Sequence, residues 1–290
     1  MSQVKLISMT QPVDTELRGM SAEDLLGYIA KVSNPSKQTE NLSRVILYCL
    51  RKKHWSPFQM VDLTFEIKTT RDIGRQILRH RSFEFQEFSQ RYASPNKDDF
   101  ETREARLQDK KNRQNSTATD NQQLADDWEF HQKNNLHHSL LTYDWAIRNN
   151  IAKEQARVVL PEGMTPTHMY MKGSLRSWIH YCQLRMGNGT QKEHQDVATE
   201  IWGIVVKVFP FLDGFIFPES FFSRFMDGME LLRPYLGPKE GAFCNSEHDT
   251  IYFYVTRDEL DPASSIGKEL QELGFYVAVN GQWCYDPLAP

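Results

Sequence analysis

The feature that most constrains the fold of this chain is a strict alternation of apolar and polar residues over residues 61–68. The apolar members are Val61, Leu63, Phe65 and Ile67. The polar members are Asp62, Thr64, Glu66 and Lys68. Because successive side chains of a strand point to opposite faces, the alternation predicts a strand with one buried and one solvated face. Sheets with one solvated face are typically antiparallel, and another layer must cover their apolar face.

Helical periodicity in the flanking segments predicts that covering layer. Ser21 is a typical N-cap for a helix through Leu25, Leu26 and Ile29. Further helices are predicted over residues 38–53, 71–80, 122–148, 174–185 and 191–208, with a shorter helix ending at Leu160 and a second strand over residues 167–172. The sequence therefore predicts a domain that combines helices with strands.

Residues 96–127 differ from their surroundings, because they are rich in charge and contain one aromatic residue, Phe100. So long a connection in a compact domain is either a functional lid or a solvated excursion. Both interpretations stay open on the sequence, and the composition also allows a short helix within residues 101–112.

The pattern changes again after residue 222. Residues 251–255, 275–279 and 282–285 have strand character, residues 264–273 have helical character, and Asn280-Gly281 is a typical two-residue hairpin turn. We predict a main domain of residues 1–222 and a small C-terminal α+β appendage of residues 223–290. The sequence leaves the role of this appendage open.

Composition excludes several classes of protein. With 34 basic and 38 acidic residues the formal net charge is −4, which argues against a general polyanion-binding surface. The N-terminus lacks the apolar core of a signal peptide, and charged residues and a proline interrupt the most apolar stretch, residues 201–217. The cysteines are too scattered for a disulfide framework or a zinc ribbon, standing at Cys49, Cys182, Cys244 and Cys284. We expect a cytoplasmic protein with reduced thiols and without membrane association.

Motifs for several kinds of chemistry are absent from the sequence. There is no P-loop, no strand-borne G-x-G-x-x-G fingerprint, no G-x-S-x-G nucleophile elbow and no H-E-x-x-H zinc motif. We interpret the histidines of the polar helical stretches as parts of solvated faces, namely His131, His137, His138 and His194. No metal site is predicted.

Arginine is concentrated in residues 79–92, which read RHRSFEFQEFSQRY. The planar guanidinium fork suits a phosphate group, and Gln76, three residues before Arg79, can face the same ligand. The segment is therefore a site for a small anionic ligand or a solvated basic turn with structural ion pairs. A third interpretation is a basic strip, interleaved with aromatic residues, that binds single-stranded nucleic acid.

A second group of basic residues favours the ligand. Arg176 and His180 lie four residues apart on one predicted helix with Ser174 and Arg185, so that Arg176 and His180 share a face. Arg157 has apolar neighbours, among which an arginine is expected to have a partner or a ligand. A nucleotide, with more than one anionic group, fits these arginines. His180 taken alone fits a structural role better.

Taken in order, these residues resemble a known family. Arg79-His80-Arg81, followed after seven residues by Ser89, resembles the R-H-R-x7-S signature of flavin-dependent thymidylate synthases, the ThyX family. Supporting matches within residues 4–220 are AKVS at 30–33, HWSPF at 54–58, RVVLP at 157–161, SLRSWIH at 174–180, QLR at 183–185, Gln191 and Glu193.

The resemblance implies an α+β fold of the thymidylate synthase-complementing type, in which helices pack on a mainly antiparallel sheet, with residues 1–222 as the catalytic domain. It implies a methyltransferase that makes dTMP from dUMP. Methylenetetrahydrofolate would donate the carbon, FAD would carry the hydride and NADPH would be the reductant. It further implies a homotetramer with active sites shared between subunits, and no nucleic acid as partner.

The same resemblance assigns the site residues position by position. For dUMP these are Gln76, Arg79, Glu87, Ser89, Gln90, Arg91, Arg157 and Arg185. For FAD they are Ser56, Arg79, His80, Arg81, Glu87, Ser174, Arg176 and His180, with Ser33 and His54 as weaker candidates. Arg185 is the predicted catalytic residue, because the matching arginine of the family lies against the uracil ring and favours ionisation at N3.

Ser89 invites a second interpretation as a nucleophile. Since no general base adjoins it in the sequence, we assign it to binding. The chain departs from the family at Gln86, where asparagine is common, and at Gln59, where a carboxylate often follows P-F. Two alternatives stand beside the synthase: a nucleic-acid-binding protein that uses residues 79–92, and an FAD-binding relic without synthase activity.

Overall fold

The structure is a computed structural model that describes residues 3–187, 189–212 and 215 of the chain. It also describes residues 242–245, 250–253, 268, 270–271, 275–277 and 283–285. The chain divides into two compact units, Met1–Asp213 and Gly214–Pro290. The predicted division at residues 222 and 223 stays a prediction, because that boundary lies outside the described residues.

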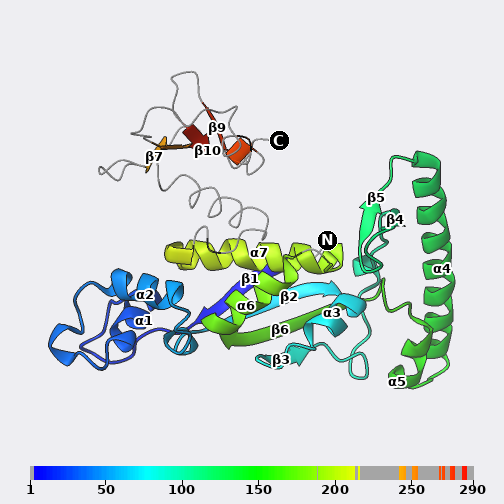
Figure 1. The fold of residues 1–290 in the computed structure, drawn as a ribbon. Helices are drawn as coiled ribbons and strands as arrows, with labels where there is room; N and C mark the ends of the chain where they lie inside the picture. Colours follow the sequence, from blue (N-terminus) through cyan, green and yellow to red (C-terminus); the bar gives the residue numbers. More distant parts are fainter. Residues whose placement is uncertain are drawn as a thin grey trace. The chain divides into compact units, whose positions relative to one another are not determined.

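The first unit is built on a four-stranded antiparallel sheet, which confirms the predicted fold class (Figure 1). The strand order is β1-β2-β6-β3, in which β2 pairs with both β1 and β6. The strands are β1 (Gln3–Met9), β2 (Asp62–Thr70), β3 (Glu84–Glu87) and β6 (Pro166–Ser174).

The alternating segment forms β2 as predicted. Leu63, Phe65 and Ile67 are fully buried, whereas the polar residues between them are partly exposed. Trp178 packs edge-on against Phe65 with ring centroids 4.7 Å apart, and its indole N–H donates to the carbonyl oxygens of Leu63 and Gly173. The apolar face of β2 therefore holds the core of this unit. Because the indole N–H of Trp178 is hydrogen-bonded, it is not an unpaired polar group in that core.

Helices pack around the sheet, and most of them match the predicted ranges. They are α1 (Ala22–Ala30), α2 (Leu42–Arg51), α3 (Arg71–Ile77), α4 (Gln122–Arg148), α5 (Lys153–Ala156), α6 (Leu175–Arg185) and α7 (Lys192–Val208). Short 3-10 turns are η1 (Pro35–Lys37), η2 (Pro57–Gln59), η3 (Lys97–Asp99), η4 (Arg157–Val159) and η5 (Pro210–Leu212).

The ends of two helices show what local sequence decides. Ser21 caps α1 as predicted, and it exchanges hydrogen bonds with Asp24 in a capping box. The predicted start at residue 38 is wrong for the second helix, because Asn41 adopts a left-handed conformation with φ 50° and α2 begins after it. Asparagine tolerates that conformation, so it separates η1 from α2.

The short helix allowed within residues 101–112 is wrong. Arg106–Gln108 form β4, which pairs with β5 (Ser116–Ala118) in a separate two-stranded sheet. The Asp109 carboxylate accepts hydrogen bonds from the backbone N–H groups of Lys111 and Asn112. Such a side-chain turn competes with helix formation, so the chain reverses there.

Helix α4 stands beside the sheet rather than on it (Figure 1). Its C-terminal part packs through Tyr143 and Ala146 against α5 and η4. Large apolar side chains along the helix stay exposed, namely Leu124, Trp128, Phe130, Leu141 and Trp145. This helix therefore buries little of its own apolar surface within one chain.

The second unit contains a four-stranded antiparallel sheet of order β7-β8-β10-β9. Its strands are β7 (Ala242–Asn245), β8 (Thr250–Phe253), β9 (Phe275–Val277) and β10 (Trp283–Tyr285). Three of them lie within predicted strand segments, β7 was not predicted, and the Asn280-Gly281 turn lies outside the described residues. Residues 268, 270 and 271 are helical, within the predicted helix.

Within the described part of the chain, no helix combines the length and the apolar character needed to cross a membrane. Cys49 and Cys182 are free and buried, as expected for reduced thiols. His131, His137 and His138 lie exposed on α4, as predicted.

Candidate active site

The Arg79-His80-Arg81 segment forms the tight connection between α3 and β3. The backbone N–H groups of Arg79 and His80 donate to the carbonyls of Gln76 and Ile77, which ends the helix three residues earlier than predicted. Arg79 and Arg81 are exposed, whereas His80 is partly buried. The turn thus presents two cationic side chains to solvent and turns the imidazole between them inward.

His80 meets Arg185, the residue predicted to be catalytic. Nε of Arg185, in the last turn of α6, donates to Nε2 of His80 at 2.9 Å. Burial, together with Arg185 and Arg79, lowers the pKa of His80 to about 4. The imidazole is therefore neutral near pH 7 and accepts this hydrogen bond through its lone pair.

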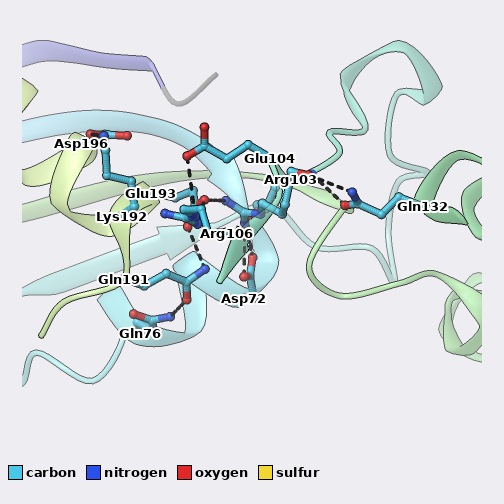
Figure 2. Close-up of polar contacts among 11 residues, drawn as sticks. Asp72, Gln76, Arg103, Glu104, Arg106, Gln132, Gln191, Lys192, Glu193 and Asp196 are labelled. Carbon is cyan, nitrogen blue, oxygen red and sulfur yellow. Dashed lines mark hydrogen bonds and ion pairs between the residues drawn. The ribbon is translucent and has the colours of Figure 1, made fainter. Parts of the chain in front are cut away.

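Gln76 lies in the same region, on the last turn of α3. Its Nε2 donates to Oε1 of Gln191 at 2.7 Å (Figure 2). Its Oε1 lies 3.2 Å from Nδ1 of His194. His194 in turn lies 2.9 Å from the hydroxyl of Tyr181. Residues from α3, α6 and α7 thus converge on one polar cluster.

The interpretation of His194 as part of a solvated face is wrong. The residue is fully buried, and burial, Arg185 and His80 lower its pKa to about 3. Val197, Ala198 and Ile201 are buried on the same helix, three, four and seven residues further on. That spacing places His194 on the apolar stripe of α7, and it is the sequence signal that could have identified it.

Glu87 lies on β3 with its carboxylate in a network of its own. Oε1 accepts from the hydroxyl of Thr167 at 2.7 Å and lies 3.8 Å from a guanidinium nitrogen of Arg71. A Cβ at Gly74 would lie 3.0 Å from Cγ2 of Thr167, so a larger residue there would crowd this pair. Burial lowers the pKa of Arg71, and the charges of Arg75 and Arg157 act in the same direction.

Ser89, Gln90 and Arg91 follow β3 in a turn, in which two backbone N–H groups donate to the Ser89 carbonyl. Arg91 is exposed and lies 3.7 Å from Glu154. Gln90 is buried, and its Nε2 has no hydrogen-bond partner among the described residues. A buried amide nitrogen without a partner is costly, so a ligand oxygen that accepts from it would be bound favourably.

The remaining FAD candidates form a second group around the start of α6. Ser174 caps the helix, and the ring of His180 lies 4.5 Å from that of Trp55. Burial and the charge of Arg176 lower the pKa of His180. This ring contact and η2, which packs against α6, place the segment that carries Ser56 beside this group.

Both groups have members on α6, but among the described residues no hydrogen bond or ion pair joins the side chains of one group to those of the other. Within residues 3–187 and 189–212, no hydrogen bond or ion pair links the side chains of Ser33, His54 or Ser56 to residues 79–91. Likewise, no ion pair neutralises Arg79, Arg81, Arg157 or Arg176 among the described residues. Guanidinium groups without carboxylate partners fit a ligand with anionic groups better than a set of structural ion pairs.

Sequence reasoning missed a set of ion pairs next to Gln76. Glu193 lies 3.3 Å from Arg103 and is also paired with Arg106, and both arginines come from the 96–127 segment (Figure 2). Arg103 also binds Asp72 at 3.0 Å. The charged segment is therefore fixed to α3 and α7, and no isolated motif predicts such long-range pairs.

The same segment lines a cleft of about 850 Å³ together with the starts of α4 and α7. Arg103, Arg106 and Trp128 are among its lining residues. The interpretation of the segment as a lid over the substrate stays a prediction. Among the described residues, no group of three histidine, cysteine or acidic side chains could hold a metal ion.

The fold and the arginine-rich site together define an α+β protein suited to a small ligand with several anionic groups. Comparison with known proteins gives the family. A family model described as thymidylate synthase complementing protein matches residues 17–211, and the chain belongs to this family.

Individual relatives support this assignment. A probable flavin-dependent thymidylate synthase of Paramecium bursaria Chlorella virus 1 is 48% identical over 212 residues, which cover 71% of this chain and 94% of the relative. A flavin-dependent thymidylate synthase of Synechocystis sp. is 46% identical over 218 residues, covering 71% and 95%. The UMP/dUMP methylase PolB of Streptomyces cacaoi, solved with 5-Br dUMP, has a TM-score of 0.60 at 24% identity and covers 72% of this chain and 92% of its own. This last likeness supports the fold.

Proposed function

We propose that the protein is a flavin-dependent thymidylate synthase that makes dTMP from dUMP. The observation that carries the proposal is the bond of Arg185 to His80, because it joins the R-H-R turn to α6 beside Gln76. The names of the two similar proteins, each covered over more than nine tenths of its length, support it.

For dUMP we propose the residues that the resemblance assigns. Gln76 and Arg79 lie at the α3–β3 connection, which Arg185 of α6 contacts through His80, whereas Gln90 follows β3 and Arg157 begins η4. The unpaired guanidinium groups suit the phosphate, and the unpartnered Gln90 nitrogen suits an acceptor oxygen. The full set is Gln76, Arg79, Glu87, Ser89, Gln90, Arg91, Arg157 and Arg185.

Arg185 is the residue for which we propose a catalytic role. A fixed positive charge beside the uracil ring lowers the free energy of the ionised ring, because the guanidinium already lies where the negative charge of the ring develops. His80 accepts from Nε of Arg185 and is neutral, so it orients the guanidinium without competing for its charge. The terminal guanidinium nitrogens stay available for the substrate.

The donor set around the R-H-R turn and the start of α6 fits FAD. Arg79, Arg81 and Arg176 provide cationic donors for a pyrophosphate, and the ring of His180 lies partly exposed beside Trp55. When bound, FAD would supply hydride transfer, which no side chain can perform. The proposed FAD residues are Ser56, Arg79, His80, Arg81, Glu87, Ser174, Arg176 and His180, and NADPH and methylenetetrahydrofolate are the proposed co-substrates.

We propose a homotetramer in which active sites are shared. The exposed aromatic residues of α4, Trp128, Phe130 and Trp145, are more than a monomeric surface helix usually leaves in water. The cytoplasmic location and the division into residues 1–222 and 223–290 stay predictions.

The nucleic-acid alternative is disfavoured by burial within residues 79–92. A stacking strip needs exposed rings, but Phe83 is buried and Phe85 is partly buried, which leaves Tyr92 as an exposed ring. An FAD-binding relic without synthase activity is distinguished from the synthase only by a measurement of dTMP formation.

Two measurements test the proposal. The purified protein should carry or take up FAD, and dUMP should perturb the flavin absorbance. Anaerobic turnover with dUMP, methylenetetrahydrofolate and NADPH should then give dTMP. A protein that cannot be loaded with flavin contradicts the proposal, and a loaded protein without turnover indicates the relic.

A further inference from the structure

A chain of hydrogen bonds runs from Tyr181 to Glu193 behind Gln76. The Tyr181 hydroxyl lies 2.9 Å from Nε2 of His194, whose Nδ1 lies 3.2 Å from Oε1 of Gln76. Nε2 of Gln76 then donates to Oε1 of Gln191 at 2.7 Å, and Nε2 of Gln191 donates to Oε2 of Glu193 at 2.9 Å (Figure 2). Every member except the two ends could take part with its donor and acceptor atoms exchanged, because amides and neutral imidazoles both donate and accept hydrogen bonds.

The Glu193 end fixes the direction of the chain. Arg103 and Arg106 both pair with this carboxylate. Burial would raise its pKa, but bonds from its own backbone N–H and from Gln191, with the charges of both arginines, hold the pKa below its usual value. An ionised carboxylate only accepts, so Gln191 must turn its NH2 group toward Glu193 and its oxygen toward Gln76.

The Tyr181 end fixes the same direction independently. The hydroxyl is buried, burial raises its pKa, and Nε2 of His194 is its hydrogen-bond partner among the described residues. A buried hydroxyl must donate to avoid a costly unpaired proton, so Nε2 of His194 carries no hydrogen. His194 is neutral because its pKa is lowered to about 3, and its single proton therefore lies on Nδ1.

The two ends agree on one orientation of Gln76. Its oxygen accepts from Nδ1–H of His194, and one hydrogen of its NH2 group goes to Gln191. The second amide hydrogen is left for a ligand. A glutamine on a solvated helix end would instead rotate freely and offer either its oxygen or its nitrogen.

We propose that Tyr181, His194, Gln191 and Glu193 are positioning residues that hold Gln76 as a hydrogen-bond donor to dUMP. Gln76 then selects an acceptor oxygen of the substrate and disfavours a donor such as a ring N–H. Arg103 and Arg106 anchor the chain from the 96–127 segment. This inference rests on the proposed function, in which Gln76 binds dUMP.

The tautomer of His194 tests the chain without reference to activity. In flavin-loaded full-length protein with 15N-labelled histidine, we expect the His194 signals of a neutral ring protonated at Nδ1. Tyr181→Phe should leave the proton on Nδ1, because the Glu193 end still turns the Gln76 oxygen toward it, and should shift the Nε2 signal as that nitrogen loses its hydrogen-bond donor. Tyr143→Phe is the matched control, because Tyr143 is also buried and its hydroxyl bonds Ser94 at 2.9 Å, outside the chain. Protonation at Nε2 in the unaltered protein overturns the proposal.

The effect on substrate is measured with the double variant Tyr181→Phe/Glu193→Gln, because either end alone still fixes the direction of the chain. We expect KM for dUMP to rise roughly tenfold, the size of one lost hydrogen bond, with flavin content and kcat at saturating dUMP unchanged. Glu104→Gln is the control, since Glu104 lies 3.6 Å from Arg106 but outside the chain. An unchanged KM, or an equal loss of kcat and flavin, overturns the positioning role.

Formation of dTMP tests the proposed function, whereas the His194 tautomer tests the direction of the chain. If the unaltered protein forms no dTMP, the proposed function fails and dUMP is no longer the ligand of Gln76. The His194 tautomer would still show whether the chain has the stated direction.

Discussion

Arg185 donates a hydrogen bond from Nε to Nε2 of His80 at 2.9 Å, and this bond requires a neutral imidazole. The pKa of His80 is lowered to about 4, so the requirement is met near pH 7. The bond holds one edge of the guanidinium, and we propose that the terminal nitrogens bind the substrate. Electrostatic stabilisation of a reacting uracil ring requires a charged group, here the guanidinium, that is held in one orientation.

Replacement of Arg185 should separate chemistry from flavin binding. Arg185→Ala is expected to lower the rate of dTMP formation by about 100-fold or more, the usual effect of removing one preorganised charge-stabilising group. The flavin content, measured by absorbance after purification, should stay near that of the unaltered protein. Near-normal turnover would show that another residue activates the uracil ring.

Acid should destabilise the protein through His80 and His194. Their pKa values in the fold are lowered to about 4 and about 3 from an ordinary 6.5, so the unfolded state binds more protons once the pH falls below about 6.5. Their contribution to the free energy of unfolding is fully present above that pH and is lost as the pH falls toward 4 and 3. Urea unfolding between pH 7.5 and 4.5 measures this slope, with the pH limits chosen to span roughly the interval of proton uptake.

A matched variant identifies the His80 part of that slope. His80→Gln keeps an acceptor within reach of Arg185 but has no titrating group, so stability should fall less steeply with acid. His131→Gln, at an exposed position on α4, controls for the loss of a histidine. Identical slopes in all three proteins would contradict the assigned role of His80.

Gly173 should tolerate no side chain. A Cβ there would lie 2.3 Å from a ring carbon of Phe83, inside the core beside Trp178. Gly173→Ala is expected to lower the free energy of unfolding by about 1–3 kcal/mol, the usual cost of overpacking. Gly203→Ala on α7 is the control, because no atom lies within 4 Å and alanine should stabilise the helix by up to about 1 kcal/mol. Equal stabilities in chemical denaturation would contradict this account of the core.

The exposed aromatic residues of α4 should bind another subunit. Trp145→Glu places a charge in that surface, and we expect a shift to smaller assemblies in light scattering behind size exclusion. Lys133→Glu, on the same helix and ion-paired with Glu129, controls for a change of charge. Unchanged assembly in Trp145→Glu would exclude this part of α4 from the interface.

Local patterns predicted the parts of the fold that local forces decide. The alternation around Phe65 predicts β2, and the Ser21 cap predicts the start of α1. β1, β3, β4, β5 and β7 were missed, because short strands gain their stability from pairing partners that a local window does not contain. The left-handed Asn41 moved the start of one predicted helix, and the turn at Asp109 replaced another. In each case one residue outweighed a weak helical preference.

The candidate site divides in a similar way. The R-H-R turn and Arg185 could be found from their motif, and the structure places them in contact. His194 was misjudged because a histidine next to charged residues looks solvated, although its spacing from Val197 and Ile201 places it on the buried stripe. The pairs of Glu193 with Arg103 and Arg106 depend on the tertiary position of the 96–127 segment, so no sequence pattern predicts them.

We propose that the Arg185–His80 contact lies in a dUMP and flavin site. The most direct measurement is the flavin absorbance spectrum of the FAD-loaded full-length protein during titration with dUMP, with Arg185→Ala titrated alongside. We predict a saturable change in the unaltered protein and a much weaker one in the variant, at equal flavin content. A spectrum that does not respond to dUMP, or that responds equally in both proteins, would contradict the claim.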